Sequence, residues 1–260
     1  MLKVIPFIAL VTFSLSALAD DHENSWRGVN LDQQFGIQFE ICSLLPGKSL
    51  ADMAKLDGDV RTQFDMNTQG LSLMRLTPLF SHGMPGNSQV DFIDVTLGPI
   101  TDFGSSWDKW MSSEDAQRLM SKIDDVAECT FKFARANNRV AKTEALDATD
   151  SRLVSMEWCS KRENIRWSQI IEQHDQWEAS YGESGSSMAW NVVIPRLGSG
   201  DRRGQFMHMV SYENTAQLMA NEEWIANGGG AAALRNYYDA YANCEGESVW
   251  SAEYIYRNES

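Results

Sequence analysis

The chain has 260 residues, of which 36 are acidic and 22 are basic, and its formal net charge is -14 at pH 7. The acidic residues are spread along the chain rather than gathered in one tail. Nucleic acids and anionic membrane surfaces are bound through basic patches, so neither is an expected partner. No apolar run after residue 19 approaches the ~18 residues of a membrane-spanning helix, and no membrane insertion is expected.

The first 19 residues have the pattern of a secretory signal peptide. Lys3 is followed by an apolar run from Val4 to about Leu15, and the small residues Ala17-Leu18-Ala19 precede Asp20. This arrangement is typical of a cleaved export signal. We therefore expect a secreted or bacterial periplasmic protein, with residues 20–35 forming an exposed lead-in.

A short motif occurs twice. Glu40-Ile41-Cys42-Ser43 returns as Glu157-Trp158-Cys159-Ser160, which is 117 residues later (157 minus 40). Pro78 and Pro195 each lie 36 residues after the cysteine of their own copy. A spacing this far above the ~20 to 50 residues of solenoid repeats predicts two similar domains in tandem. Their expected bounds are 36–136 and 151–257, with 137–150 as the linker.

The four cysteines fit one disulfide in each unit. An export signal places them where disulfides persist, and four cysteines allow three pairings. The separation from Cys42 to Cys129 is 87 residues (129 minus 42), and that from Cys159 to Cys244 is 85 (244 minus 159). The repeat therefore favours the pairs Cys42–Cys129 and Cys159–Cys244. A zinc site is the rival interpretation, but no C-x-x-C spacing supports it.

The first unit reads as strand, helix, strand, strand, helix, strand. Residues 36–43 alternate between apolar and polar, which indicates a strand, and Ser49 can cap the helix that follows. Helical or strand periodicity then predicts the remaining elements. They are a helix from 50 to about 64, strands 71–80 and 90–97, a helical region 102–128 and a strand 130–135.

The second unit repeats this order. Its predicted elements are strand 152–159, a helix carrying Trp167, Ile170, Ile171, His174 and Trp177 on one face, strands 189–197 and 205–212, helices 214–224 and 231–243, and strand 248–256. A βαββαβ unit predicts an α+β ferredoxin-like fold with both helices on one face of a four-stranded antiparallel sheet. Two such units in one chain can press their sheets together, which predicts an intramolecular barrel and a monomeric pseudo-dimer.

On this element order, on the duplication and on the aromatic helix entries Ser106-Trp107-Asp108-Lys109-Trp110 and Glu222-Glu223-Trp224, the chain resembles the dimeric α+β barrel superfamily. That superfamily includes the antibiotic-biosynthesis monooxygenase, EthD and NIPSNAP types. The resemblance implies a cavity between sheet and helices in each unit that takes small apolar molecules. It carries over no shared catalytic motif, and no cofactor is expected.

Aligning the two copies pairs the residues that could carry chemistry. The first unit offers Glu40, Asp57 and Asp94, and the second offers Glu157, His174 and His208 at the equivalent positions. Two histidines and one carboxylate could bind iron, zinc or manganese, so Glu157, His174 and His208 form a possible metal triad, although no metal is the main expectation. A hydrogen-bonded core histidine is the alternative for His174, and His208 is a similar case.

The alternation of the second unit's first strand predicts which way its glutamate points. Val154, Met156 and Trp158 form its more apolar side and are expected to meet the helices, so that Glu157, like Glu40, looks into the space between the sheets. Two carboxylates in that space would raise each other's pKa unless a cation is present, and Arg75 is the candidate, its counterpart being Val192. A structural ion pair and a general acid or base are both open interpretations.

The favoured function is the binding of a small apolar molecule in the helix–sheet cavities, with Asp57, Asp94, Arg75, His208, Trp167 and Trp177 as lining residues. Catalysis would be a cofactor-independent oxygenation or isomerisation, with His174 as proton acceptor and with Glu157 and Glu40 as further candidates. Two alternatives remain, which are a non-catalytic structural or interaction module and a metal-dependent enzyme at the triad.

Overall fold

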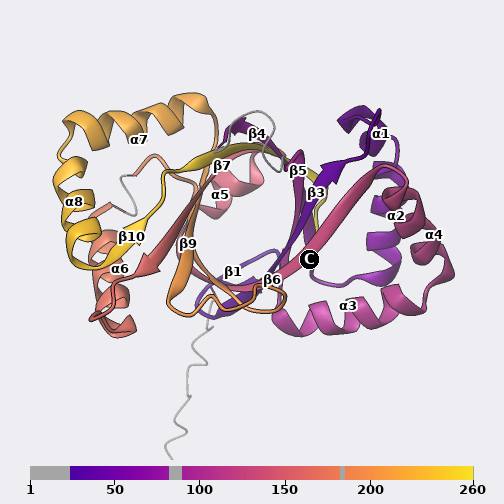
Figure 1. The fold of residues 1–260 in the computed structure, drawn as a ribbon, viewed down its shortest axis with the longest axis horizontal. Helices are drawn as coiled ribbons and strands as arrows, with labels where there is room; N and C mark the ends of the chain where they lie inside the picture. The colour runs from indigo at the N-terminus through magenta and orange to yellow at the C-terminus, as the bar shows by residue number, and fades with distance from the viewer. Residues whose placement is uncertain (1–23, 82–89, 182–184, 260) are drawn as a thin grey trace, which may run out of the picture.

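The computed structural model describes residues 24–81, 90–181 and 185–259, and it shows two βαββαβ units joined in one barrel (Figure 1). The predicted signal peptide lies outside the described residues. In the first unit the elements are β3 (Gln34–Leu44), α1 (Leu50–Ala54), α2 (Asp57–Asn67), β4 (Ser72–Phe80), β5 (Phe92–Gly98), α3 (Ile100–Ser112), α4 (Glu114–Asp124) and β6 (Ala127–Ala141). The predicted element order is confirmed, with each predicted helical region divided into two helices.

The second unit follows the same plan. Its elements are β7 (Ser151–Lys161), α6 (Trp167–Tyr181), β8 (Ala189–Pro195), β9 (Gln205–Tyr212), α7 (Thr215–Asn227), α8 (Gly230–Ala240), β10 (Ala242–Cys244) and β11 (Ser248–Tyr256). Side-chain caps set several helix starts. Ser49 and Asp52 form a capping box at α1, and Asn214 accepts a hydrogen bond from the backbone N–H of Gln217 at α7.

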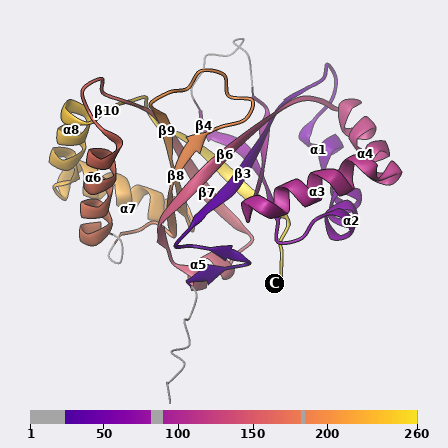
Figure 2. The same cartoon turned by 90° about the horizontal axis from the view of Figure 1, so that it is seen from below.

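The two sheets are continuous with each other. Each unit has the ferredoxin-like strand order, β6-β3-β5-β4 in the first and β11-β7-β9-β8 in the second. Antiparallel pairing of β11 with β4 and of β6 with β8 joins the units at both edges, so eight strands close into a barrel. Helices α1 to α4 cover one side of the barrel and α6 to α8 the other (Figures 1 and 2).

The inside of the barrel holds the main hydrophobic core. Alternate residues of every strand point inward, and those fully or largely buried there include Ile37, Phe39, Met74, Leu76, Val95, Val154, Met156, Val193, Met207, Met209 and Trp250. Val154 and Met156 thus face the barrel interior and not the helices, which overturns the predicted orientation of β7. Trp158 lies on the same side of β7 at an open end of the barrel, where its side chain is 41% exposed.

Two segments outside the units contribute more structure than expected. Within the predicted lead-in, β1 (Ser25–Trp26) pairs with β2 (Val29–Asn30), and Trp26, Val29 and Leu31 are buried, so this stretch is not an exposed tail. In the predicted linker, β6 continues to Ala141 and is followed by α5 (Thr143–Asp147). The connection between the units is therefore part of the packed structure. No helix in the described ranges is both long and apolar enough to cross a membrane.

Both predicted disulfides are present. Cys42 and Cys129 are directly opposite on β3 and β6, and Cys159 and Cys244 are opposite on β7 and β10. The first joins β3 to the start of β6, and the second joins β7 to the end of β10, the short strand that precedes β11. The pairs close loops of 87 and 85 residues, which gives them nearly equal effects on the entropy of the unfolded chain.

Replacing either cysteine pair by serine is expected to lower the free energy of unfolding by roughly 2 to 5 kcal/mol, and the two losses should agree within about 1 kcal/mol because the loops are equally long. Urea unfolding of the two double variants, compared with the oxidised parent, measures both values. A loss confined to one pair would contradict the loop-entropy explanation.

Candidate functional site

The two helix–sheet interfaces place equivalent residues in the same register. Glu40 on β3 is opposite Asp94 on β5, and Glu157 on β7 is opposite His208 on β9. Arg75 on β4 is opposite Asp94, just as Val192 on β8 is opposite His208. The strand equivalences inferred from the repeated motif therefore hold in three dimensions. All of these side chains are on the outer face of the barrel, toward the helices.

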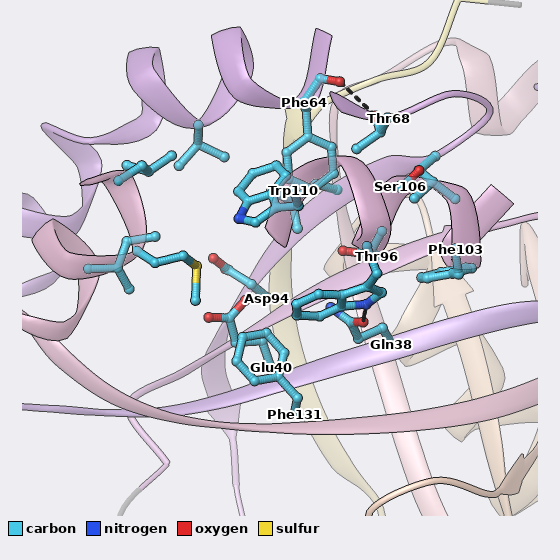
Figure 3. A pocket seen from close by; sticks show the side chains of 17 residues that line it. Gln38, Glu40, Phe64, Thr68, Asp94, Thr96, Phe103, Ser106, Trp110 and Phe131 are labelled. Carbon is cyan, nitrogen blue, oxygen red and sulfur yellow. Dashed lines mark hydrogen bonds between the residues drawn. The ribbon is translucent and has the colours of Figure 1, made fainter. Parts of the chain in front are cut away.

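The first unit contains a cavity of about 70 Å³ between its sheet and helices α2, α3 and α4 (Figure 3). Its walls are mostly apolar, and its polar groups come from the sheet, from α3 and from Thr68 at the end of α2. The lining residues that the argument uses are Gln38, Glu40, Thr96, Ser106, Trp107 and Trp110. The hydroxyl of Ser106 is buried without a hydrogen-bond partner among the described residues, so it is available to a ligand.

Glu40 is the polar group that distinguishes this cavity. Its carboxylate has no side-chain hydrogen bond within the described part of the chain, and the neighbouring Gln38 is occupied by the indole N–H of Trp107 at 2.8 Å. Burial, followed by the nearby charge of Asp94, raises the pKa of Glu40 to about 8, and Arg75 only partly offsets this. The group is therefore mainly protonated at pH 7 and close to its titration point.

Arg75 is fully engaged elsewhere. Its guanidinium donates to both oxygens of Asp94 at 2.8 Å and to Asp57 at 2.7 Å, and it lies over the ring of Phe92. Burial alone would lower the pKa of Arg75, but the two carboxylates reverse that effect and raise it. The predicted pairing of Arg75 with Glu40 and Glu157 is thus wrong, because two other carboxylates lie within direct hydrogen-bonding distance.

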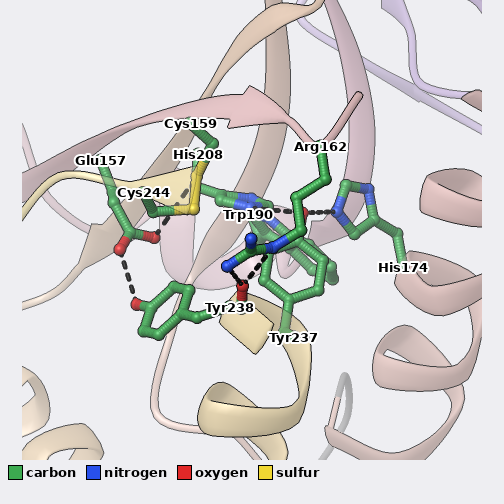
Figure 4. Close-up of a disulfide and its surroundings, with 9 residues drawn as sticks. All are labelled: Glu157, Cys159, Arg162, His174, Trp190, His208, Tyr237, Tyr238 and Cys244. Atoms are coloured by element: carbon green, nitrogen blue, oxygen red, sulfur yellow. Dashed lines mark hydrogen bonds between the residues drawn. A yellow bond between two sulfur atoms is a disulfide. The ribbon is translucent and has the colours of Figure 1, made fainter. Parts of the chain in front are cut away.

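The equivalent interface of the second unit is filled with aromatic side chains. The hydroxyl of Tyr237 on α8 lies between the two histidines, 2.9 Å from Nε2 of His174 and 3.4 Å from Nε2 of His208. Trp190 donates its indole N–H to Nδ1 of His208 at 3.1 Å, and Trp177 packs against Tyr237. Figure 4 shows Tyr237, the two histidines and Trp190 beside the disulfide.

The hydrogen bonds define the tautomers. An indole N–H only donates, so Nδ1 of His208 accepts and the proton of the neutral ring is on Nε2. That proton is directed to the Tyr237 hydroxyl, which in turn donates to Nε2 of His174. Burial lowers the pKa of His208 to about 4, and burial together with His208 and Arg139 lowers that of His174 to about 2. Both imidazoles are therefore weak bases, and Nε2 of His174, which was the predicted proton acceptor, is hydrogen-bonded to Tyr237.

Glu157 points toward the helices and not into the space between the sheets. Its carboxylate accepts a hydrogen bond of 2.7 Å from Tyr238 on α8 and lies 4.0 Å from the sulfur of Cys159 (Figure 4). Burial raises the pKa of Glu157, and the hydrogen bond from Tyr238 opposes this rise. The structure does not gather Glu157, His174 and His208 around one point. In the described ranges, the groups of three possible ligands within 4.8 Å of one another each contain one glutamate and one disulfide.

The remaining residues that were predicted to line a cavity lie in three different places. Asp94 borders the first cavity, Asp57 is held in the Arg75 network, and Trp167 borders a large cleft beside α6 together with His174. Sequence reasoning missed Trp190, Tyr237 and Tyr238. Trp190 could have been found, because it is two residues before Val192 on a strand and therefore shares its face. The tyrosines lie on a helix that carries no repeated motif.

Arg75→Gln is expected to lower the free energy of unfolding by about 3 to 5 kcal/mol at pH 7, because it leaves Asp94 and Asp57 buried without their cation. Chemical denaturation measures the loss. Arg118→Gln is the matched control, since Arg118 is exposed on α4 beside Glu114 and Asp115, where ion pairs contribute less than about 1 kcal/mol. Equal losses in the two variants would contradict a buried ion-pair network.

Both imidazoles of the second unit are expected to stay neutral at pH 5, although an ordinary histidine with a pKa of about 6.5 is mostly charged there. The unfolded chain binds protons that the folded chain does not, so these histidines lower stability as the pH falls from about 6.5 toward 4. Nitrogen-15 NMR of the imidazoles, folded and in urea, tests this. Protonation of either His174 or His208 near pH 6.5 in the folded protein would refute it.

Comparison of the sequence with protein-family models and with curated proteins finds no match. Solved structures do match. A provisionally assigned monooxygenase from Fusobacterium nucleatum superposes with a TM-score of 0.57 at 9% identity, covering 85% of this chain and 92% of that one. One from Lactobacillus acidophilus gives 0.51 at 8% identity, covering 85% and 94%, and a dye-decolorizing peroxidase from Bacteroides thetaiotaomicron gives 0.52 at 9%, covering 86% and 94%. At these identities the likeness concerns the fold, and the chain is a ferredoxin-like α+β barrel.

Proposed function

We propose that this protein binds a small, mostly apolar organic molecule in the cavity of the first unit and that Glu40 exchanges a proton with it. The observation that carries the proposal is one carboxyl group, unpaired in the described structure, at the edge of an apolar cavity, with a pKa near neutral pH. Acid–base catalysis is most efficient when the pKa of the catalytic group is close to the working pH. The similarity to barrels described as a monooxygenase and a peroxidase is consistent with a small-molecule site but does not supply the reaction.

The volume of the cavity limits the ligand. At about 70 Å³ it is less than half of the ~150 Å³ engineered cavity that holds benzene. A molecule of a few heavy atoms fits without rearrangement, and a ring-sized ligand requires side chains to move. The hydroxyls of Ser106 and Thr96 can orient a carbonyl or hydroxyl group, while Trp107, Trp110 and Phe64 contact its apolar part.

The chemistry follows from the state of Glu40. Its ionised form can accept a proton from a carbon next to a carbonyl, and the resulting acid can return that proton to the same or a neighbouring carbon. This sequence is an isomerisation that consumes no cofactor. An oxygenation would begin with the same proton removal and would need molecular oxygen as the oxidant. In this proposal Glu40 takes the role that was predicted for His174, because the imidazole of His174 is held by Tyr237.

Export is part of the proposal. The signal-like segment at residues 1–19 and two disulfides fit a secreted or periplasmic protein. The intramolecular closure of the barrel fits a monomer, because the sheet edges that two separate units would share are already paired within one chain.

A non-catalytic binding protein is the second candidate, and it is favoured by one observation. In the second unit the equivalent interface is packed with aromatic side chains and holds neutral histidines. One copy of the fold is therefore stable without a reactive group at this interface, and the other copy can be so too. This candidate predicts that a ligand binds but that its bonds to hydrogen remain unchanged.

Butanone in deuterium oxide is a suitable probe, since it is small and has exchangeable protons beside its carbonyl. We expect the protein to accelerate the exchange, with a rate that rises with pH and levels off above about 8 as Glu40 ionises. Glu40→Gln should lower the catalysed rate by at least about 100-fold, which is the lower range for a positioned acid or base. Proton NMR of butanone measures the exchange.

The matched control is Glu128→Gln, which changes the same group at an exposed position next to Cys129. It should leave the rate unchanged. Shifts of the Trp107 indole N–H signal report binding separately. Binding without exchange would favour the non-catalytic candidate, and the absence of both would remove the cavity as a site for carbonyl compounds of this size.

A further inference from the structure

A cleft of about 970 Å³ lies where the two units meet, apart from the Glu40 cavity. Its floor is the outer face of β6 and β8, with Arg135 and Arg139 from β6 and Val192 and Ile194 from β8. One wall is α6, and the other is the turn of residues 196–204 between β8 and β9. Since β6 belongs to the first unit and β8 to the second, neither unit alone forms this cleft.

The cleft is strongly basic in an acidic protein. Five arginines line it, at positions 135, 139, 196, 202 and 203, against a single acidic lining residue, Asp201. The chain as a whole has a formal net charge of -14. Arg139 and Arg203 have carboxylates beside them, but Arg135, Arg196 and Arg202 make no ion pair in the described ranges, and a bound anion would compensate their charge.

Several of these arginines have unused hydrogen-bonding capacity. In the described ranges Arg135 makes no ion pair, and its Nε is buried without a hydrogen-bond partner. Arg139 contacts the exposed carboxylates of Asp175 and Glu178, yet its Nε is likewise unpartnered. Arg203 lies 3.7 Å from Asp201 at a highly exposed position, where such a pair contributes little.

The remaining surface of the cleft is apolar. Trp167, Ile170 and Ile171 on α6 face it, and Leu197 stands at the turn. Ile171 and Leu197 are 51% and 70% exposed, so the cleft presents apolar surface to solvent on two of its sides. Inorganic phosphate would leave these groups in water, whereas a ligand with an apolar body would cover them.

From this combination we infer that the cleft binds an amphipathic organic anion, a molecule with one carboxylate or sulfonate group on an aromatic or aliphatic body. The anionic group contacts Arg135 and its neighbours on β6, and the body packs against Trp167, Ile171 and Leu197. A guanidinium group matches a carboxylate in shape and binds it through two parallel hydrogen bonds. Nucleic acid does not fit, because a chain with a formal net charge of -14 repels a polyanion.

This site is independent of the proposed proton transfer. The Glu40 cavity is lined by α2, α3 and α4, whereas one wall of the cleft is α6. These helices are on opposite sides of the barrel (Figure 2). A failure of the butanone experiment would therefore leave the inference about the cleft untouched, and the reverse is also true.

Two fluorescent probes separate the contributions of charge and of apolar contact. 8-Anilinonaphthalene-1-sulfonate carries the anion, and N-phenyl-1-naphthylamine has the same rings without it. We expect the sulfonate to bind the folded protein at one site and at least about tenfold more tightly than the neutral compound. Arg135→Gln should weaken the sulfonate about tenfold and change the neutral compound less than twofold, and added salt should weaken the sulfonate alone.

Arg118→Gln is the control, because it removes the same charge from an exposed position on α4. It should leave the binding of both probes unchanged. Arg196→Gln provides a second test on the exposed turn, where loss of folding is not expected, and it should also weaken the sulfonate. The inference is overturned if neither cleft variant weakens the sulfonate, if Arg118→Gln weakens it equally, or if the neutral compound binds as tightly.

Discussion

Backbone pairing across two seams, β11 with β4 and β6 with β8, is the constraint on which the rest of this structure depends. It leaves no unpaired edge between the units and encloses one interior, which is lined by apolar residues from all eight barrel strands. Since the core is inside the barrel, the outer face of each sheet is free to carry charged and hydrogen-bonding side chains under the helices. Glu40, Arg75, Asp94, Glu157 and His208 are all on that outer face.

The two units stabilise the buried polar side chains on their outer sheet faces by different interactions. In the first, Arg75 forms ion pairs with both Asp94 and Asp57, and Glu40 is left beside a cavity. In the second, Val192 replaces the arginine, and neutral histidines share hydrogen bonds with Tyr237 and Trp190. The two copies of the fold thus differ, with a small cavity beside Glu40 in one and aromatic packing around two histidines in the other. The cleft between the units is a third environment that neither copy has alone.

Sequence patterns predicted the order of the elements, the two disulfides and the pairing of positions between the copies. These depend on local periodicity and on counting residues, which the chain itself displays. The direction in which each face of a strand points was predicted less well. Val154, Met156 and Trp158 were correctly grouped on one side of β7, but that side was assigned to the helices. The alternation of apolar and polar residues shows which side chains share a face of a strand, but it does not show what that face packs against. Here the apolar face points into the barrel and meets the other strands.

Repeats, periodicity and cysteine spacing are properties of the chain, so they suffice to predict two ferredoxin-like α+β units in tandem with one disulfide in each. Which face of each strand is buried in the barrel depends on the tertiary structure. So do the ion pairs of Arg75 with Asp94 and Asp57, and the position of the unpaired Glu40 next to a cavity. The tertiary structure also brought the arginines of β6 together with the turn near residue 200, about 60 residues away. Such contacts join segments far apart in the chain, so only barrel closure and side-chain packing define them.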